Sequence, residues 1–228
     1  ALSGRVTATL KVGAVPLDKY FFELDPQFTI DSVIINGKQC VWSTNEYIRT
    51  AILDTPLNGG TIVDAKVAYH GTPLAGNGFF KAGLNNTVAD PWGAKYTYTL
   101  SEPYMARNWW PCKQSLTDKI GSADIWITVP AHLKAASNGL LQQITAVTGN
   151  KLRYEWETHY RTDYYLFFVA VGPYIDYSYK VAIPGLQDSL LVQNYIYENP
   201  QALSAYKSGI DSTAQMLQYF STLFGPYP

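Results

Sequence analysis

One short stretch of the sequence concentrates residue types that could do chemistry. Residues 99–112, TLSEPYMARNWWPC, hold one carboxylate (Glu102), one guanidinium (Arg107), two tryptophans and a thiol. Glu102 follows a strand-like segment and precedes a proline, so it is expected at a strand end, where a side chain can leave the sheet. Its aromatic neighbours would desolvate it and strengthen its attraction for a cation. The residues leave two interpretations open: a structural ion pair between Glu102 and Arg107, which they favour, and a carboxylate that binds a ligand ammonium group.

Other arrangements that could support catalysis are weak. The histidines at positions 70, 132 and 159 lie far apart and outside any H-E-x-x-H pattern, so no metal ligand is predicted, although separated residues can converge in space. No G-x-S-x-G elbow that would expose a serine nucleophile occurs. Glu155 and Glu157 share one side of a strand by period-2 geometry and could serve acid/base work. A solvated strand face is the favoured explanation for this carboxylate pair.

Composition and charge narrow the class of protein. The 228 residues carry a net charge of −1 with no long run of like charges, which indicates neither a nucleic acid nor an anionic membrane surface as partner. No apolar run reaches the roughly 18 to 20 residues that cross a bilayer. Aromatic residues make up 14% of the chain and charged residues only 15%. Together with its tyrosine content, this composition favours a β-protein in a secreted or periplasmic setting.

The two cysteines, Cys40 and Cys112, allow two states. They could form one disulfide in an oxidising compartment. Two separate buried thiols are favoured, because free cysteine behaves as a small hydrophobic residue. The lack of a C-x-x-C pair argues against a cysteine-based zinc site or redox pair. The chain opens without Met and directly on a strand pattern, so we expect a trimmed form whose start says nothing about targeting.

Alternating apolar residues and turn signals predict about fourteen strands in series. An Asn-Gly dipeptide at residues 36–37 indicates a tight hairpin turn, because both of its central residues need a positive φ. Residues 71–93 are expected to be irregular, with Phe79 and Phe80 inward. The strands are expected at residues 6–12, 20–24, 30–35, 38–42, 47–53, 61–70, 96–100, 123–129, 133–136, 140–147, 151–157, 164–171, 174–183 and 189–197.

The pattern changes at Glu198. Asn199 and Pro200 form a good helix start, with Asn as N-cap and Pro at the first helical position. Apolar residues then recur at three- and four-residue steps, which predicts an amphipathic helix of about 25 residues that stops at Gly225. The residues thus predict an all-β chain of antiparallel sheets or a β-sandwich, followed by one C-terminal helix. Because this helix lacks a helical partner, we expect it to begin another domain.

Residues 101–112, SEPYMARNWWPC, closely resemble the E-P-x-x-A-R-x-x-F-P-C motif of the gluzincin-clan zinc aminopeptidases, the aminopeptidase N type. Other similar segments follow the family's order and cover nearly the whole chain. Leu100 departs from the Gln of many members, which could make the pocket for the first substrate side chain more hydrophobic. Residues 111–116 lack the Asp and Pro of the usual turn, which puts that turn in doubt but not the fold. The other similar segments are residues 2–6, 118–119, 137–139, 165–172 and 219–228.

The resemblance implies a fold, a role and a missing part. Residues 1–197 would be the saddle-shaped N-terminal domain of a zinc metalloaminopeptidase, and residues 198–228 the first helix of an absent thermolysin-like catalytic domain. The family's β domain lends one residue that binds the α-amino group of a peptide substrate, and the motif places it at Glu102. The H-E-x-x-H pattern, the third zinc ligand and the G-x-M-E-N loop do not occur in this sequence. Zinc is therefore expected in the parent enzyme, while this chain alone is expected to bind none and to be inactive.

The expected partners are the N-terminus of a peptide substrate and the missing catalytic domain, which would pack on the β domain and the helix. An alternative stays open: a non-catalytic, aromatic-rich β-sandwich that binds peptide or carbohydrate within a pseudo-enzyme. The sequence beyond Pro228 would distinguish the two. Residues 85–87 also form an N-x-T triplet, with Asn85 as the acceptor of a glycan. Side-chain specificity and oligomeric state do not follow from the sequence.

Overall fold

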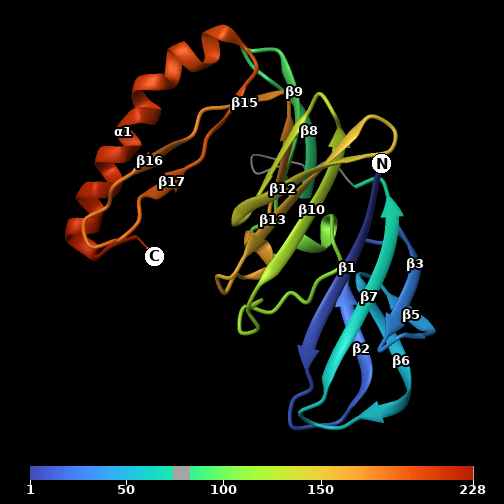
Figure 1. Ribbon diagram of the computed structural model, residues 1–228. Coiled ribbons are helices and arrows are strands. Elements are labelled where there is room, and N and C mark those ends of the chain that lie inside the picture. Colours follow the sequence, from blue (N-terminus) through green and yellow to red (C-terminus); the bar gives the residue numbers. More distant parts are fainter. Residues whose placement is uncertain (74–82, 228) are drawn as a thin grey trace.

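Eighteen strands precede one α-helix within residues 1–73 and 83–227, the part of the chain that the computed structural model describes (Figure 1). Every strand pair in this part is antiparallel. The predicted fold class, antiparallel β-sheets followed by one C-terminal helix, is confirmed. The expected inward position of Phe79 and Phe80 falls outside the described residues.

Two small sheets form the N-terminal lobe, which we define as residues 1–73. Burial alternates along the outermost strand of the first sheet, so one face turns to the core and the other to solvent. The core between the sheets includes Phe22, Leu24, Val33 and Val63. One sheet has the order β1 (Leu2–Lys11), β7 (Ile62–Gly71), β3 (Phe28–Ile35), β4 (Lys38–Gln39), and the other the order β2 (Leu17–Glu23), β6 (Ile48–Leu57), β5 (Trp42–Asn45).

Two further sheets form the second lobe, which we define as residues 83–172. Its core contains Val129, Ala135, Tyr154 and Trp156, and this lobe lies above the N-terminal lobe in Figure 1. One sheet has the order β11 (Lys134–Ser137), β14 (Val169–Gly172), β9 (Ala94–Leu100), β8 (Gly83–Ala89), and the other the order β10 (Ala123–Pro130), β13 (Lys151–Thr158), β12 (Leu140–Val147).

Two local predictions in the second lobe are wrong. Strand β8 lies inside the segment that was expected to be irregular, and it pairs with β9 along its full length. Its buried positions hold glycine, asparagine and alanine, so it shows no apolar alternation that sequence reasoning could detect. The strand expected at residues 164–171 begins instead with a 3₁₀ turn, η2 (Tyr164–Leu166), and only its end is in β14.

Helix α1 (Pro200–Phe224) packs along a narrow β-ribbon beside the second lobe (Figure 1). The Asn199 side chain accepts a hydrogen bond from the Gln201 backbone N–H at 2.9 Å, which confirms the predicted N-cap. The Tyr179 hydroxyl donates to the Ile210 carbonyl at 2.6 Å and so ties the ribbon to the helix. Residues 174–197, expected as two strands, form four short ones: β15 (Tyr174–Asp176) pairs with β18 (Tyr195–Tyr197), and β16 (Tyr179–Val181) with β17 (Leu190–Val192).

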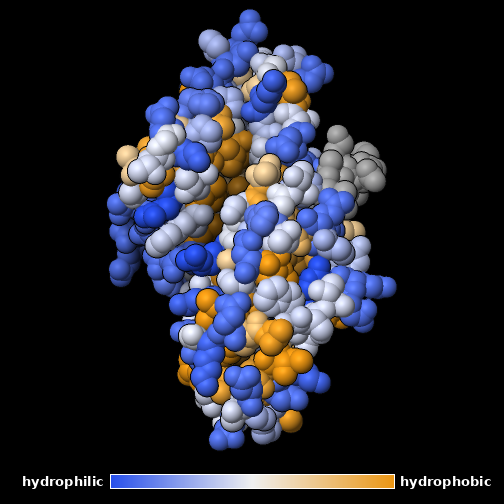
Figure 2. Space-filling view, turned by 90° about the vertical axis from the view of Figure 1, so that its right-hand side faces the viewer, coloured by the Kyte–Doolittle hydropathy of each residue, from blue (hydrophilic) through white to orange (hydrophobic). Residues whose placement is uncertain are grey.

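The surface is mixed in polarity, with hydrophobic side chains exposed over the N-terminal lobe at the lower end of the molecule (Figure 2). The exposed apolar residues of this lobe include Phe21, Val41 and Ile52. A search of the described residues for a helix with the length and hydropathy of a membrane span found none.

Candidate functional site

The candidate site is the segment that leaves β9 and crosses to the N-terminal lobe, residues 101–112. It contains one short 3₁₀ turn, η1 (Ala106–Asn108). Glu102 lies just past the end of β9 and is exposed, as expected for a carboxylate at a strand end. Within the described residues its side chain has no hydrogen-bond or ion-pair partner. The exposed carboxylate can therefore meet a group from outside this chain.

Two expectations about Glu102 are wrong in this structure. Arg107 does not pair with it, because its Nη1 donates to the Glu23 carboxylate at 2.7 Å. The nearby tryptophans do not desolvate it either. Trp110 packs against the core of the N-terminal lobe and against Phe167, so its ring faces inward while Glu102 stays in water.

Aromatic side chains hold the two residues on either side of Glu102. The Trp109 indole N–H donates to the Ser101 hydroxyl at 2.9 Å. The Tyr164 hydroxyl donates to the Pro103 carbonyl at 2.5 Å. Burial raises the pKa of Tyr164 to about 12, so this phenol keeps the proton that it donates. The exposed carboxylate therefore stands between two fixed residues.

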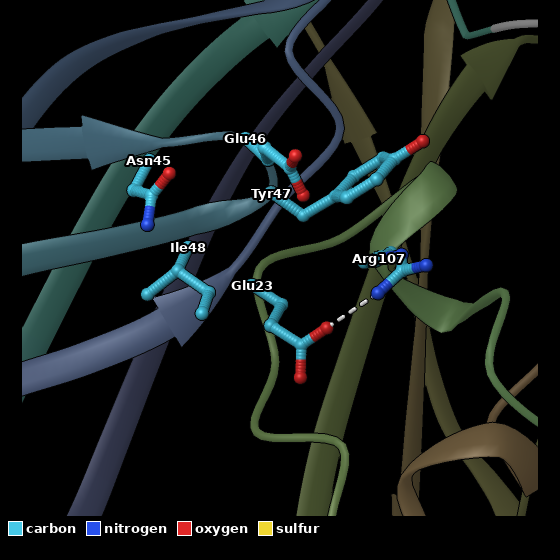
Figure 3. Close-up of a pocket in the computed structure, with 6 residues that line it drawn as sticks. All are labelled: Glu23, Asn45, Glu46, Tyr47, Ile48 and Arg107. Atoms are coloured by element: carbon cyan, nitrogen blue, oxygen red, sulfur yellow. Dashed lines mark hydrogen bonds and ion pairs between the residues drawn. The ribbon is translucent and has the colours of Figure 1, made fainter.

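Arg107 joins this segment to the N-terminal lobe (Figure 3). Its guanidinium lies 3.9 Å from the centre of the Tyr47 ring, in addition to the Glu23 ion pair. Gln114 Nε2 donates to the same Glu23 oxygen at 3.0 Å. A shallow hollow of about 350 Å³ lies beside the pair and is lined by Glu23, Asn45, Glu46, Tyr47, Ile48 and Arg107.

Backbone hydrogen bonds make the same segment an extra neighbour of β2. The Glu23 N–H donates to the Cys112 carbonyl at 2.8 Å, and the Cys112 N–H returns to the Glu23 carbonyl at 3.1 Å. Burial, with a contribution from Glu23, raises the pKa of the Cys112 thiol well above its usual value. Cys40 and Cys112 are both buried free thiols, which confirms the favoured interpretation of the two cysteines.

The other candidates from the sequence stay apart. His70 pairs with Asp31 at 2.8 Å and His159 with Glu157 at 3.0 Å, and both pairs are solvent-exposed. His132 is exposed between β10 and β11. No group of three or more His, Cys, Asp or Glu residues that could hold a metal ion is found in the part of the chain that the structure describes.

The strand-face carboxylate and the glycan acceptor have structural explanations. Glu155 accepts hydrogen bonds from Thr145 at 2.7 Å and from Arg153 at 2.9 Å, and these bonds lower its pKa. Such a carboxylate stays ionised and is satisfied by its strand neighbours. Its side chain is only 15% exposed, so the favoured solvated strand face does not describe Glu155. Asn85 is only 3% exposed within β8, so the folded strand does not present the triplet's acceptor to a glycosylating enzyme.

Sequence reasoning missed three partners of the candidate segment: Glu23, Tyr47 and Tyr164. They come from β2, from the turn before β6 and from η2, and none lies close to residue 102 in sequence. No local pattern marks them, because a single carboxylate or aromatic ring in a strand-rich region has no distinctive spacing. The tertiary fold alone brings them to this segment.

Solved structures of M1 zinc metallopeptidases match almost the whole chain. Two of an enzyme from Deinococcus radiodurans, one of them a mutant, are 25% and 26% identical to it, with TM-scores of 0.82. A two-domain M1 zinc metallopeptidase mutant bound to L-tryptophan is 25% identical, with a TM-score of 0.83. Each match covers 99% of this chain, which spans about half the length of these relatives. No protein-family model and no curated protein matches the sequence.

Proposed function

Since this chain has the fold of the N-terminal half of the M1 zinc metallopeptidases, we propose that it is the substrate-amine-binding domain of a zinc-dependent aminopeptidase. Such an enzyme removes N-terminal amino acids from peptides. In this proposal residues 1–197 are the β domain and residues 198–228 begin the catalytic half. The structural match over 99% of the chain carries the proposal.

Glu102 is the residue through which the domain would act. A carboxylate attracts the α-ammonium group of a peptide and makes a charge-assisted hydrogen bond with it. The free carboxylate at the end of β9 has the exposure that such a contact needs. If a catalytic half covers the site and excludes water, the attraction strengthens as the local dielectric falls. Peptides with a blocked amine would lose this contact, which favours cleavage at the N-terminus over internal cleavage.

Zinc would be held outside the described residues. They offer no group of ligands that could bind it, so the contribution of this chain is to bind and orient the substrate amine. Zinc, when held by the catalytic half, would supply the Lewis-acid chemistry of peptide hydrolysis.

The partner would be that catalytic half, docked partly on α1. Near its C-terminal end the helix exposes Tyr219, Phe220, Leu223 and Phe224, each with more than half of its surface in solvent. A contiguous apolar surface of this kind marks an interaction site. The solved relatives extend over about twice the length of this chain, so a further half is the occupant that we propose.

The sequence downstream of Pro228 is the first test. An H-E-x-x-H pattern with a third zinc ligand beyond it would support the proposal. A second half that lacks these ligands would contradict it and favour the alternative of a non-catalytic peptide- or carbohydrate-binding module.

The second test is Glu102→Gln in the intact protein. This change removes the charge but keeps the shape, and it should lower kcat/KM for aminoacyl substrates by roughly 30-fold, as expected for the loss of a charge-assisted contact. Asp54→Asn is a matched control, because Asp54 is an exposed carboxylate on β6 in the N-terminal lobe. An unchanged kcat/KM in Glu102→Gln would refute the assignment.

A further inference from the structure

The position of Glu102 depends on how its backbone is held, because its side chain makes no hydrogen bond or ion pair within the described residues. Binding an ammonium group requires a carboxylate oxygen within hydrogen-bond reach, and a displacement of about 1 Å can cost two orders of magnitude in rate. An exposed loop residue would not keep this position unaided. The supports on either side of it therefore matter for function.

Both residues that flank Glu102 are fixed by aromatic donors, of which Tyr164 is buried and Trp109 is partly buried. On one side, Ser101 is 2% exposed and its hydroxyl accepts the Trp109 indole N–H at 2.9 Å. On the other side, the Pro103 carbonyl accepts the Tyr164 hydroxyl at 2.5 Å. A buried polar group without a partner destabilises a fold, so each of these bonds holds its donor and acceptor together.

The two donors are themselves anchored in different lobes. Tyr164, from η2 of the second lobe, is 1% exposed and packs with Ala106 and Cys112. Trp109 is tied to the N-terminal lobe, because its carbonyl accepts the Tyr69 hydroxyl of β7 at 2.9 Å. The backbone at Glu102 is thus connected to both lobes through these two residues.

We propose that Tyr164 and Trp109 are positioning residues that hold Glu102 for the substrate amine. This inference rests on the proposed function. Tyr164 allows the cleaner test of the two, because phenylalanine would fill the same buried space and remove only the hydroxyl. The hydroxyl then serves the bond to Pro103, next to the carboxylate.

The test is a double-mutant cycle in the intact protein with an aminoacyl substrate. Tyr164→Phe should lower kcat/KM by about three- to tenfold, the loss expected from one hydrogen bond. In the Glu102→Gln background the same change should have no further effect, because the residue that it positions is already disabled. Tyr154→Phe is the matched control: Tyr154 is a buried tyrosine whose hydroxyl donates to the Leu133 carbonyl at 3.3 Å in the core of the second lobe.

A second readout separates positioning from general destabilisation. Inhibition by L-leucine should weaken about three- to tenfold in Tyr164→Phe, while inhibition by its α-hydroxy analogue, which lacks the ammonium group, should not change. Tyr154→Phe should leave both inhibition constants unchanged.

The outcomes distinguish the inference from the proposed function. A loss of kcat/KM in Tyr164→Phe that persists in full beside Glu102→Gln would overturn the inference. So would an unchanged kcat/KM in Tyr164→Phe while Glu102→Gln lowers it. An unchanged kcat/KM in Glu102→Gln would overturn the proposed function, and the inference with it.

Discussion

Arg107 forms a 2.7 Å ion pair with Glu23, a residue 84 positions earlier in the chain. Both side chains are about three-quarters buried, and the guanidinium also lies over the Tyr47 ring. The pair fastens the segment that carries Glu102 to β2 of the N-terminal lobe. The ion pair therefore helps to hold the segment whose Glu102 is proposed to bind the substrate amine.

Replacing Arg107 should destabilise the fold strongly. Arg107→Ala leaves Glu23 partly buried without its cation and removes the contact with the ring, so we expect a loss of about 2 to 4 kcal/mol in the free energy of unfolding. Urea denaturation of the chain measures this loss. Lys113→Ala is the control, since Lys113 pairs with Asp118 at the surface and its removal should cost less than about 1 kcal/mol. Equal losses in the two variants would contradict the prediction.

The Asn138-Gly139 turn should not tolerate a side chain. Gly139 has φ +86°, and an added Cβ would lie 1.9 Å from the Glu157 carbonyl oxygen. Gly139→Ala must therefore shift the backbone of β13 and should cost about 3 kcal/mol or more. Gly149→Ala tests the same positive φ without a clash, because nothing lies within 4 Å of the added Cβ, and it should cost only about 1 kcal/mol. Thermal unfolding of both variants would show this difference, and similar melting temperatures would refute it.

The fold should lose stability in alkali. Burial raises the pKa of Tyr20, Tyr164, Tyr174 and Tyr195 to about 12, above the ordinary value of 10. A raised folded-state pKa means that the stabilising effect is complete below pH 10 and is lost as the pH rises toward 12. The free energy of unfolding, measured by urea denaturation from about pH 8 to 12, should fall above pH 10. Tyr164→Phe removes one of the titrating groups and should make this decline shallower. An equal slope of the free energy of unfolding against pH in the variant and the unmodified chain would contradict the prediction.

Residues 1–228 by themselves should bind no stoichiometric zinc and show no peptidase activity. The described residues contain no group of ligands for a metal ion, and the sequence has no H-E-x-x-H pattern. Elemental analysis of the purified chain, after dialysis against zinc and then against buffer, would check the first expectation. One zinc ion per chain would contradict it.

Local patterns in the sequence determined most of the fold. Alternation of apolar residues located most of the strands, Asn199 and Pro200 marked the start of α1, and the motif around Glu102 resembled that of the zinc aminopeptidases. These signals depend on neighbours within a few positions, such as the two faces of a strand or the free N–H groups at a helix start. They can therefore be detected without knowledge of the tertiary structure.

Only the tertiary structure decided which side chains meet. Glu102 lies five positions from Arg107 and was the favoured partner of that guanidinium. Arg107 pairs with Glu23 instead, because Glu23 and Cys112 exchange backbone hydrogen bonds that bring β2 to this segment. Strand β8 escaped detection for a similar reason: its residues show no alternation, and pairing with β9 holds it in place. Within the described residues the Glu102 carboxylate has no partner, because long-range contacts, which no local spacing encodes, occupy its neighbours.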